Sequence, residues 1–329
     1  MRGMTRRAML AAATLGAGAS ALARPAQAQG AWPERTVVLV VPYAPGGSND
    51  VVARLLAPKL QALLGQTIVV ENRAGAGGAI GTAQVARSAP DGYTLLVSSA
   101  SNHVMNPLVV PDQGYDVQKA FDGVSMLVDV PLALTVANKL GVKDVPGLLA
   151  LLKREPGKHS FASSGVGGSQ HLAGELFRMR ADVDIVHVPY RGGGPALNDL
   201  VAGQVSMGFL NLPTALPQAE AGKVTILAVA GEKRSALKPD LPTVAEAGVP
   251  GFAVRSWTAL FAPHGTPPNL VGKLNAALRA AMADTTLQAR LRELGVEPDL
   301  SEPQVLDAFV RDEFALWGPV IKAAHVTAQ

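Results

Sequence analysis

The sequence predicts an α/β protein with largely parallel sheets and helices packed on them. Short apolar runs typical of buried strands alternate along the chain with segments of helical spacing. The 34 glycines and 24 prolines are spread between those runs as turns and do not gather in a linker. About 300 residues remain after an N-terminal export segment, which is enough for two domains.

The first 28 residues have the three parts of an export signal peptide. Arg2, Arg6 and Arg7 make a basic start, residues 9–22 are small and apolar, and Ala26-Gln27-Ala28 fits an A-x-A cleavage signal. Thr5-Arg6-Arg7-Ala8-Met9-Leu10 also fits the twin-arginine pattern, with an ordinary Sec signal as the alternative. The apolar part is short, and the chain has no cysteine for a lipid anchor or a disulfide. We therefore expect cleavage near Ala28 and a soluble periplasmic protein.

The mature chain is close to neutral. Residues 1–28 hold four arginines and no acidic residue, so their removal changes 29 basic against 26 acidic residues to 25 against 26, a net charge of −1. No dense cluster of Lys and Arg remains. Because nucleic-acid binding depends on clustered basic side chains, nucleic acid is not expected as a partner.

The first unit after the signal points to an anion site. Residues 37–41 (VVLVV) predict a buried strand, residues 42–47 a Pro/Gly-rich turn, and Ser48, Asn49 and Asp50 an N-cap ahead of a helix. Such a unit directs free backbone N–H groups at whatever lies above the strand end. Gly46 and Gly47 would let a ligand approach the backbone closely.

The same alternation continues through the middle of the chain. We expect strands at residues 67–71, 93–98, 159–162, 185–188, 205–210 and 224–230. Helices are expected at residues 79–87, 171–179 and 196–202, with turns or loops at 75–78, 99–103, 163–169 and 190–195. Ligands of such sheets lie beyond the carboxyl ends of the strands, which makes these loops site candidates.

The C-terminal third is predicted to be more helical. A strand at 257–261 is followed by a helix that Thr266 caps and Pro267 opens. Ser301-Glu302-Pro303-Gln304 has the form of a capping box for a final helix toward His325. Pro58 and Pro319 fall inside the first and last long helices, and we expect each to kink or end its helix.

The glycines from Gly75 to Gly81 lie between a strand and a helix, as those of a dinucleotide-binding loop do. Their spacing is G-x-G-x-x-x-G, and the next strand ends in Ser98-Ser99 without an acidic residue for the ribose. A tight turn is therefore the better interpretation, and no cofactor is expected.

Nucleophilic catalysis and metal binding have little support. The chain contains no G-x-S-x-G motif. Ser163, Ser164 and Ser169 lie near His171, but polar lining of a ligand loop explains them better than a triad. The six histidines are dispersed, without an H-x-x-x-H pair or a thiolate. We expect no catalytic residue, no metal site and no enzyme, with an exported serine hydrolase as the alternative.

What remains is a set of loops of one kind, at residues 45–49, 99–103, 163–169 and 190–194. Each follows a predicted strand and is small, polar or glycine-rich, as α/β turns often are. Four such loops in one exported two-domain chain indicate a shared cleft.

These residues also resemble a known family. Pro42-Tyr43-Ala44-Pro45-Gly46-Gly47 with Asp50 is similar to the first ligand loop of the tripartite tricarboxylate transporter substrate-binding proteins, also called the Bug family. Further matching motifs are Glu71-Asn72-Arg73-Ala74-Gly75-Ala76-Gly77-Gly78, Pro90-Asp91-Gly92-Tyr93-Thr94-Leu95-Leu96, Tyr190-Arg191-Gly192-Gly193-Gly194-Pro195-Ala196, Leu241-Pro242-Thr243-Val244-Ala245-Glu246-Ala247-Gly248 and, after Trp257, Ala262-Pro263-His264-Gly265-Thr266-Pro267.

The resemblance implies a two-lobed periplasmic binding protein, type II-like, with a ligand cleft between the lobes. Lobe 1 would hold residues 29–131 and 251–329, and lobe 2 residues 132–250, so that two chain crossings form the hinge. Members commonly bind carboxylates through backbone amides and ordered water, without an arginine clamp. Helix N-termini favour negative charge by about 0.3–1 kcal/mol each when exposed.

Carried over residue by residue, the resemblance implies four ligand loops. Asn49 stands where relatives often have Thr. Arg191 stands where relatives often have Lys, and we interpret it as a solvated or interlobe charge. Asp50 could complement the dipole of its own helix or accept a hydrogen bond from the ligand. The implied ligand-binding residues are Tyr43, Gly46, Gly47, Ser48, Asp50, Ser101, Asn102, Asn106, Ser164, Gly165, Gly168, Ser169, His171, Tyr190, Gly192, Gly193, Ala196 and Asn211.

The resemblance further implies a solute receptor, expected as a monomer, that delivers a small organic solute to large and small membrane permease subunits. A receptor without a transporter that signals to a sensor protein stays open. A carboxylate is the favoured ligand, while neutral amides and aromatic acids remain possible; Tyr43, Tyr190 and Trp257 could each line the cleft.

Overall fold

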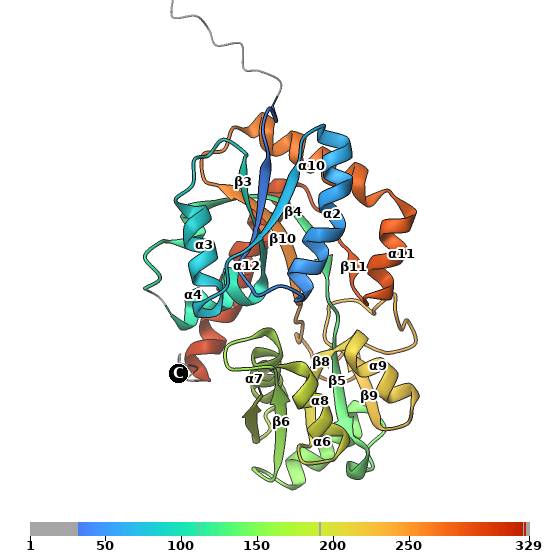
Figure 1. Cartoon of the computed structure of the whole chain (residues 1–329). Coiled ribbons are helices and arrows are strands. Elements are labelled where there is room, and N and C mark those ends of the chain that lie inside the picture. The colour runs from blue at the N-terminus through green and yellow to red at the C-terminus, as the bar shows by residue number, and fades with distance from the viewer. Residues whose placement is uncertain (1–31, 111, 191, 325, 327–329) are drawn as a thin grey trace, which may run out of the picture.

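The computed structural model describes residues 32–110, 112–190, 192–324 and 326. The predicted signal peptide and Arg191 lie outside the described residues. The chain forms two α/β lobes, one above the other in Figure 1, each built around one sheet. Lobe 1 is the six-stranded sheet of order β11-β4-β10-β3-β1-β2 with its helices, and lobe 2 is the five-stranded sheet of order β7-β6-β8-β5-β9 with its helices. The two-lobed α/β prediction is confirmed.

Lobe 1 is assembled from both ends of the described chain. Its strands are β1 (Val37–Val41), β2 (Ile68–Asn72), β3 (Thr94–Ser99), β4 (Phe121–Asp129), β10 (Trp257–Pro263) and β11 (Glu297–Pro298). Its helices are α2 (Ser48–Leu64), α3 (Ala79–Ala86), α4 (Asn106–Val109), α5 (Val117–Ala120), α10 (Pro268–Met282), α11 (Thr285–Glu293) and α12 (Pro303–Ala323), with short turns η1 (Ala76–Gly78) and η2 (Ser101–Met105).

Lobe 2 is formed by the middle of the chain. Its strands are β5 (Leu132–Ala137), β6 (His159–Ser163), β7 (Ile185–Pro189), β8 (Met207–Asn211) and β9 (Val224–Val229). Its helices are η3 (Asn138–Leu140), α6 (Val145–Arg154), α7 (Ser169–Ala181), α8 (Gly193–Val201) and α9 (Leu212–Glu220).

Both sheets are mixed, so the expectation of largely parallel sheets is wrong. β1 pairs in parallel with β2 and β3, and β6 with β7 and β8. β10 is antiparallel to β3 and β4, and β5 is antiparallel to β8 and β9. The antiparallel strands adjoin the points where the chain passes between lobes, and such strands enter a sheet without the helical crossover that a parallel pair needs.

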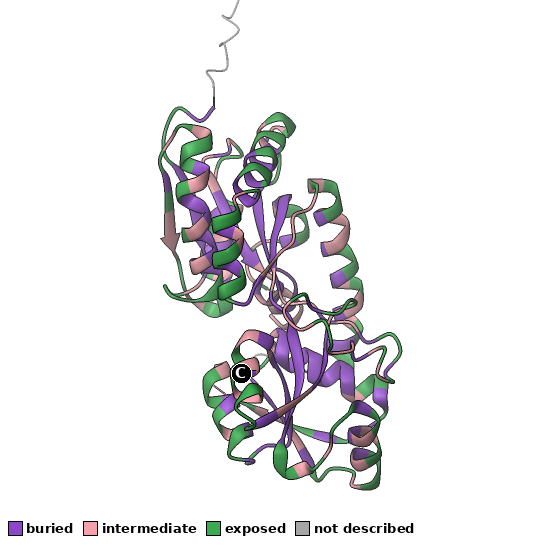
Figure 2. Ribbon diagram, turned by 90° about the vertical axis from the view of Figure 1, so that its right-hand side faces the viewer, coloured by how far each residue is buried: buried purple, intermediate pink, exposed green. Residues whose placement is uncertain are grey.

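The sheet of lobe 1 is covered on both faces, as Figure 2 shows by the purple strands between helices. On one face Leu39 and Val41 belong to a core with α2 and α10. On the other face Val40 belongs to a core that includes side chains of α12 and continues into lobe 2. This burial on both sides explains why residues 37–41 are apolar without alternation.

Helix starts and the effect of internal prolines differ from the sequence predictions. Gly47, and not Ser48, Asn49 or Asp50, is the N-cap of α2, and α2 continues through Pro58. Pro267 takes the N-cap place before α10 that was expected of Thr266, whose hydroxyl donates to the carbonyl of Pro263. The last helix likewise continues through Pro319.

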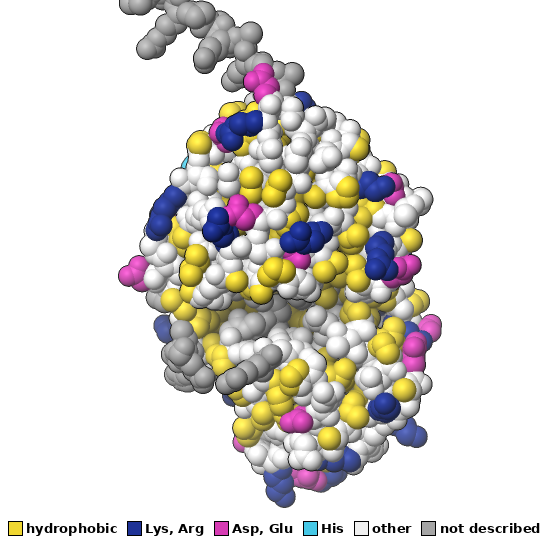
Figure 3. All heavy atoms as spheres, in the orientation of Figure 1, with side chains coloured by type: hydrophobic (Ala, Val, Ile, Leu, Met, Phe, Trp, Pro, Cys, Tyr) yellow, Lys and Arg dark blue, Asp and Glu magenta, His cyan; other side chains and the backbone are white. Residues whose placement is uncertain are grey.

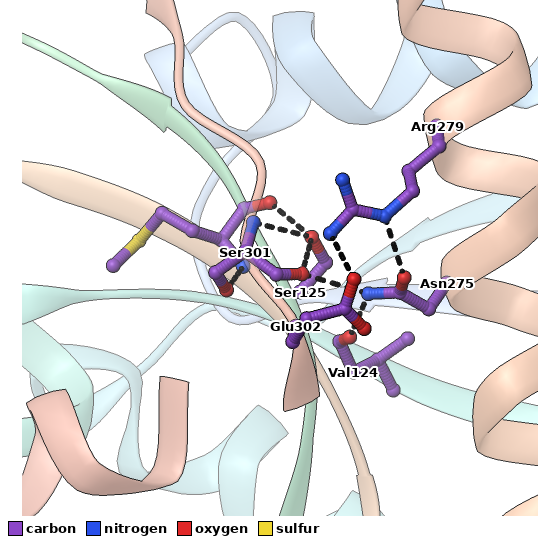
Figure 4. Close-up of polar contacts among 7 residues, drawn as sticks. Val124, Ser125, Asn275, Arg279, Ser301 and Glu302 are labelled. Atoms are coloured by element: carbon purple, nitrogen blue, oxygen red, sulfur yellow. Dashed lines mark hydrogen bonds and ion pairs between the residues drawn. The ribbon is translucent and has the colours of Figure 1, made fainter. Parts of the chain in front are cut away.

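Ser301 does not form the predicted capping box. Figure 4 shows it joined instead to β4: its hydroxyl accepts the N–H of Met126 at 3.0 Å, and its carbonyl accepts from Ser125 and Asn275. Glu302 is the N-cap of α12, and its carboxylate accepts a hydrogen bond from the Arg279 guanidinium at 2.7 Å. These hydrogen bonds of Ser301 therefore hold the start of α12 against β4 of lobe 1.

Two chain segments connect the lobes side by side. β4 ends at Asp129 and β5 begins at Leu132, while the second segment joins β9 to β10. The N–H of Val130 donates to the carbonyl of Ser256 at 2.7 Å, which ties the two connections together. The lobes also meet where α12 packs against α7.

Candidate functional site

A cleft of about 1730 Å³ lies between the lobes, and Figure 3 shows the surface hollowed at this level. Its walls include segments that follow β1, β3, β6, β7 and β8, together with the hinge residues Val130 and Ser256. All four predicted loops contribute to it. The sequence therefore located the right strand ends in both lobes.

Most predicted ligand residues line this cleft. Tyr190 and Trp257 line it together with Tyr43. The predicted residues on its wall are Tyr43, Gly47, Ser48, Ser101, Asn106, Ser164, Gly165, Gly168, Ser169, Tyr190, Gly192 and Asn211. Six are not on the wall: Asp50, Asn102, His171 and Ala196 are buried, Gly46 is exposed and Gly193 is half-buried.

Each lobe presents one long helix to the cleft by its N-terminus. Gly47 is the N-cap of α2, with φ −73° and ψ 165°, and Gly168 is the N-cap of α7, with φ −83° and ψ 167°. Both glycines are followed by a serine that also lines the cleft, Ser48 and Ser169. Because the first N–H groups of a helix have no intrahelical acceptor, the cleft receives donors from both sides.

The two loops before these helices are fixed by side chains from the helices themselves. Asp50 accepts the N–H of Gly46 at 2.9 Å, and His171 accepts the N–H of Gly167 at 3.0 Å through Nδ1. Asp50 is also bound by Arg54 at 3.0 Å. Asp50 and His171 are both buried and do not reach the cleft. This geometry favours a role in supporting the two loops from behind over the predicted role as ligand contacts.

Burial and hydrogen bonding set the charge of these two side chains. Burial acts to raise the pKa of Asp50, but hydrogen bonds from Arg54, the N–H of Gly46 and Asn72 hold it below its usual value. Burial, and to a lesser extent the neighbouring His187, whose ring stacks on it with centroids 3.7 Å apart, lowers the pKa of His171 to about 3. Asp50 is therefore charged and His171 neutral near pH 7.

Residues 101–105 form a π-helical turn, η2, where a loop was expected. Asn102 is buried there; its Oδ1 accepts from the N–H and hydroxyl of Ser99, and its Nδ2 donates to Thr82 and Ser98. Those bonds use the amide fully, so Asn102 organises the second loop and does not line the cleft. The π turn leaves Ser101 on the cleft wall, where its hydroxyl lies 3.4 Å from that of Ser169 in lobe 2.

The fourth loop is only partly exposed to the cleft. Gly192 lines it, whereas Gly193 begins α8 and Ala196 is fully buried in the core of lobe 2. The hydroxyl of Tyr190 donates to Asp199 at 2.7 Å. Burial and that carboxylate raise the pKa of Tyr190 to about 12, so its ring lines the cleft with a neutral hydroxyl.

Two further amide side chains belong to the site: Asn49, which the sequence placed in the first cleft loop without a role, and Gln170, which sequence reasoning did not single out. Gln170 accepts the N–H of Ser164 at 3.0 Å and donates to Asn211 at 3.2 Å, which joins two cleft loops of lobe 2. Asn49 accepts the hydroxyl of Thr258 at 3.0 Å, while its buried Nδ2 has no hydrogen-bond partner among the described residues. Thr258 follows Asn49 by 209 residues, a contact that no local pattern could indicate.

The cleft is nearly free of charged side chains. Among the described residues that line it, only Arg87 and Asp112 are charged. Over all the residues that the structure describes, no group of three or more His, Asp and Glu residues is arranged to hold a metal ion. None of the described helices is long and apolar enough to cross a membrane. Recognition of a polar ligand would therefore depend mainly on backbone N–H groups, hydroxyls and amides.

Comparison with known sequences identifies one family over most of the chain. Residues 52–326 match the model of the tripartite tricarboxylate transporter family receptor. The protein BugT of Bordetella pertussis is 40% identical over 292 residues, which cover 88% of this chain and 90% of BugT. A protein encoded in the tcbD-tcbE intergenic region of a Pseudomonas species is 38% identical over 304 residues, 92% of this chain and 90% of that protein.

Solved structures agree with this assignment. Rpa4515 of R. palustris, solved with adipate, has a TM-score of 0.76 and 39% identity, covering 90% of this chain and 99% of that one. MatC of Rhodopseudomonas palustris, with bound malate, has a TM-score of 0.72 and 36% identity, covering 88% and 100%. The periplasmic binding protein BugD has a TM-score of 0.73 and 38% identity, covering 91% and 100%.

Proposed function

This chain belongs to the tripartite tricarboxylate transporter receptor family, and on that premise we propose that it is a periplasmic receptor for a small carboxylate. The observation that carries the proposal is the pair of glycine-capped helix N-termini, at Gly47 and Gly168, on opposite walls of one cleft. Each helix end favours an anion by about 0.3–1 kcal/mol when exposed and by more when the site closes. The relatives solved with adipate and with malate support a carboxylate ligand here.

The unpartnered amide of Asn49 favours the same kind of ligand. Its Nδ2 is buried beside the cleft and lacks an acceptor, while Thr258 occupies its oxygen. Leaving such a donor unpaired costs about 1–3 kcal/mol. A ligand oxygen or a bridging water would satisfy it.

We propose that the ligand is held by closure of the lobes about the paired connections at Val130 and Ser256. The lobe boundaries would then lie near residues 131 and 250, as the sequence predicted. Ser101 of lobe 1 and Ser169 of lobe 2 already meet at 3.4 Å on the cleft wall, so closure would seal the site along that contact. Hinge closure of this kind is typical of two-lobed binding proteins.

The remaining parts of the proposal concern the surroundings of the protein. We propose export through a twin-arginine signal removed near Ala28, a monomer in the periplasm, and delivery of the solute to large and small permease subunits. An enzyme is not proposed: Ser163 lies 2.7 Å from His187, but Ser163 is fully buried and its hydroxyl also donates to the carbonyl of Gly165. A substrate would have no access to that serine.

A binding screen on the mature protein, residues 29–329, tests the proposal. Small carboxylates and their amides would be compared by thermal shift, where a ligand at about 100 times its Kd adds roughly 2.7 kcal/mol of stability. Gly47→Val should fold, because Gly47 has an ordinary φ and the nearest atom to an added Cβ is 3.8 Å away. It should nevertheless lose the carboxylate, because the side chain would cover the helix end.

The control for that variant is Gly272→Val in α10, where an added Cβ meets open space away from the cleft. It should bind as the parent protein does. Unchanged affinity in Gly47→Val, or stabilisation by amides and not by acids, would overturn the proposed anion site.

A further inference from the structure

The cleft extends beyond the space between the helix N-termini. Its volume of about 1730 Å³ exceeds the 300–1,000 Å³ typical of small-molecule sites. The additional wall is one face of α3 and the residue after it: Ile80, Ala83, Gln84 and Arg87 line the cleft at i, i+3, i+4 and i+7 spacing. We call this extension, which Val109, Val110, Asp112 and Gln113 also line, the α3 groove.

The middle of the α3 groove is apolar. Ile80 is 58% exposed, and Ala83, Val109 and Val110 line the same space. Val166 of lobe 2, 38% exposed, brings another apolar side chain to the cleft. Large apolar side chains gathered in a concave site indicate that an apolar part of a ligand lies there.

The far end of the α3 groove holds the two charged residues of the cleft wall. The Arg87 guanidinium reaches toward Gly114, since a Cβ placed on Gly114 would lie 3.3 Å from its Nη2. No carboxylate of the described residues lies within ion-pair distance of Arg87. Gln113 is already used by Asn106 and Tyr115. Arg87 is therefore a cation available to a ligand.

We propose that the receptor accepts elongated dicarboxylates, with one carboxylate at the helix N-termini, the hydrocarbon chain in the α3 groove and the second carboxylate at Arg87. This inference rests on the proposed function and adds the length and the second charge of the ligand. Ala79 and Arg87 are eight residues apart on one helix, so the α3 groove runs for about 12 Å along the helix axis. We therefore expect the distal carboxylate of a long diacid to reach Arg87 and a short diacid to bind without that contact.

Asp112 allows a second test of the inference, because its charge is opposite to that of Arg87. Asp112 lines the same end of the groove and would repel the distal carboxylate that Arg87 attracts. Exposed charge pairs contribute about 0.2–1 kcal/mol, so we expect effects between about 1.4-fold and fivefold. Arg87→Gln should weaken binding of a long diacid by that factor, and Asp112→Asn should strengthen it.

Calorimetry on the mature protein would use succinate, adipate, suberate, sebacate and the monocarboxylate octanoate. Affinity should rise with chain length, by up to about fourfold for each buried methylene. Ile80→Thr should flatten that rise, whereas Val305→Thr, which is also 58% exposed but lies on α12 outside the cleft, should not. Arg87→Gln should affect sebacate and leave succinate and octanoate unchanged, with Arg311→Gln as the control outside the cleft.

The outcomes separate the two proposals. If carboxylates bind and Gly47→Val abolishes binding, but the Arg87 and Asp112 variants leave sebacate affinity unchanged, the α3 groove inference is wrong and the receptor function stands. An effect of the same sign in both variants, or tighter binding of an ω-amino acid than of sebacate, also overturns the inference. If none of the carboxylates binds, both proposals are wrong.

Discussion

Asp50 and His171 occupy equivalent positions in the two lobes. Each is the third residue of the helix that faces the cleft, and each accepts the backbone N–H of the glycine four residues before it, at 2.9 Å from Gly46 and 3.0 Å from Gly167. A carboxylate and a neutral imidazole therefore perform the same task, because both offer an acceptor at the same height above the helix end. The ligand loops are shaped by groups that do not face the cleft.

Removing either acceptor should loosen its loop without removing a ligand contact. His171→Ala leaves the N–H of Gly167 to solvent, and one hydrogen bond contributes about 0.5–1.5 kcal/mol. We expect carboxylate affinity to fall about three- to tenfold in His171→Ala and in Asp50→Ala. Isothermal calorimetry with the best ligand of the screen would measure this.

The control is His159→Ala. His159 is also buried but lies at the start of β6, where it contacts Ser206 and Glu155 outside the cleft. It should lower stability and leave affinity intact. A loss of a hundredfold or more in His171→Ala would mean that the imidazole touches the ligand, contrary to the geometry.

Buried histidines should make the protein lose stability in mild acid. Burial lowers the pKa of His103 to about 3, of His171 to about 3 and of His187 to about 4, whereas the unfolded chain binds these protons near pH 6.5. Between pH 6.5 and 4 the unfolded state therefore holds more protons. The free energy of unfolding should fall by up to about 1.4 kcal/mol per pH unit for the fully buried His103, and by less for His171 and the half-buried His187.

Asp129 acts in the opposite direction over part of that range. Burial raises its pKa to about 6, an effect that Arg255 only partly offsets, so the native state binds a proton there before the unfolded state does. Between pH 6 and 4 this gain in the free energy of unfolding should offset roughly the loss caused by one histidine. Urea midpoints from pH 7.5 to 4.5 would measure the net loss, and a histidine among the three that titrates near pH 6.5 by NMR would contradict it.

The sequence predicted those parts of the fold that local pattern determines. Residues 37–41 are buried on both faces and read as a strand because no polar residue interrupts them. Residues 45–49 and 163–169 were placed at the cleft because they belong to a set of four small, polar or glycine-rich loops that each follow a predicted strand. Both conclusions needed only neighbouring residues.

What failed depended on distant partners. The second loop became the π turn η2 because Asn102 finds four hydrogen-bond partners, one of them Thr82, 20 residues away. Strand direction failed because an apolar run has the same pattern in parallel and antiparallel sheets. The contact of Asn49 with Thr258 and the α3 groove could not be predicted because Thr258, Val109, Val110, Asp112 and Gln113 come from other elements.

Gly174 in α7 is required by the packing of lobe 2. An added Cβ would lie 2.1 Å from the ring of Phe161, a fully buried side chain of β6. Gly174→Ala should therefore lower the free energy of unfolding by about 1–3 kcal/mol through overpacking. Urea unfolding would measure the change.

Two variants make that result specific. Gly272→Ala in α10, where an added Cβ meets open space, should be stabilising by about 0.5–1 kcal/mol because alanine costs less chain entropy in a helix. Adding Phe161→Leu to Gly174→Ala should recover part of the loss, because the smaller leucine side chain leaves room for the added Cβ. Equal stability of the two glycine variants would show that α7 stands farther from β6 than described.

Arg255 joins two carboxylates beside the hinge. Its guanidinium binds Asp129 at 3.1 Å and also contacts Asp299, and Asp129 lies at the end of β4, where the chain leaves lobe 1. Arg255→Gln leaves the partly buried Asp129 carboxylate without a neighbouring cation. Full burial would cost 3–5 kcal/mol, and the partial exposure of both side chains reduces the expected loss to about 2 kcal/mol.

The pH dependence of that loss identifies its cause. In Arg255→Gln the pKa of Asp129 should rise further above its parent value of about 6, so the carboxyl takes up its proton at a higher pH than in the parent, and the penalty for burying its charge is gone by pH 5. The difference between parent and variant should therefore shrink from pH 7.5 to pH 5, as measured by urea midpoints at each pH. Asp129→Asn in the Arg255→Gln background should restore stability at pH 7.5, because a neutral amide needs no cation. A difference that stays constant with pH would assign the loss to the contact with Asp299 or to packing of the arginine on Phe309, 5.2 Å away.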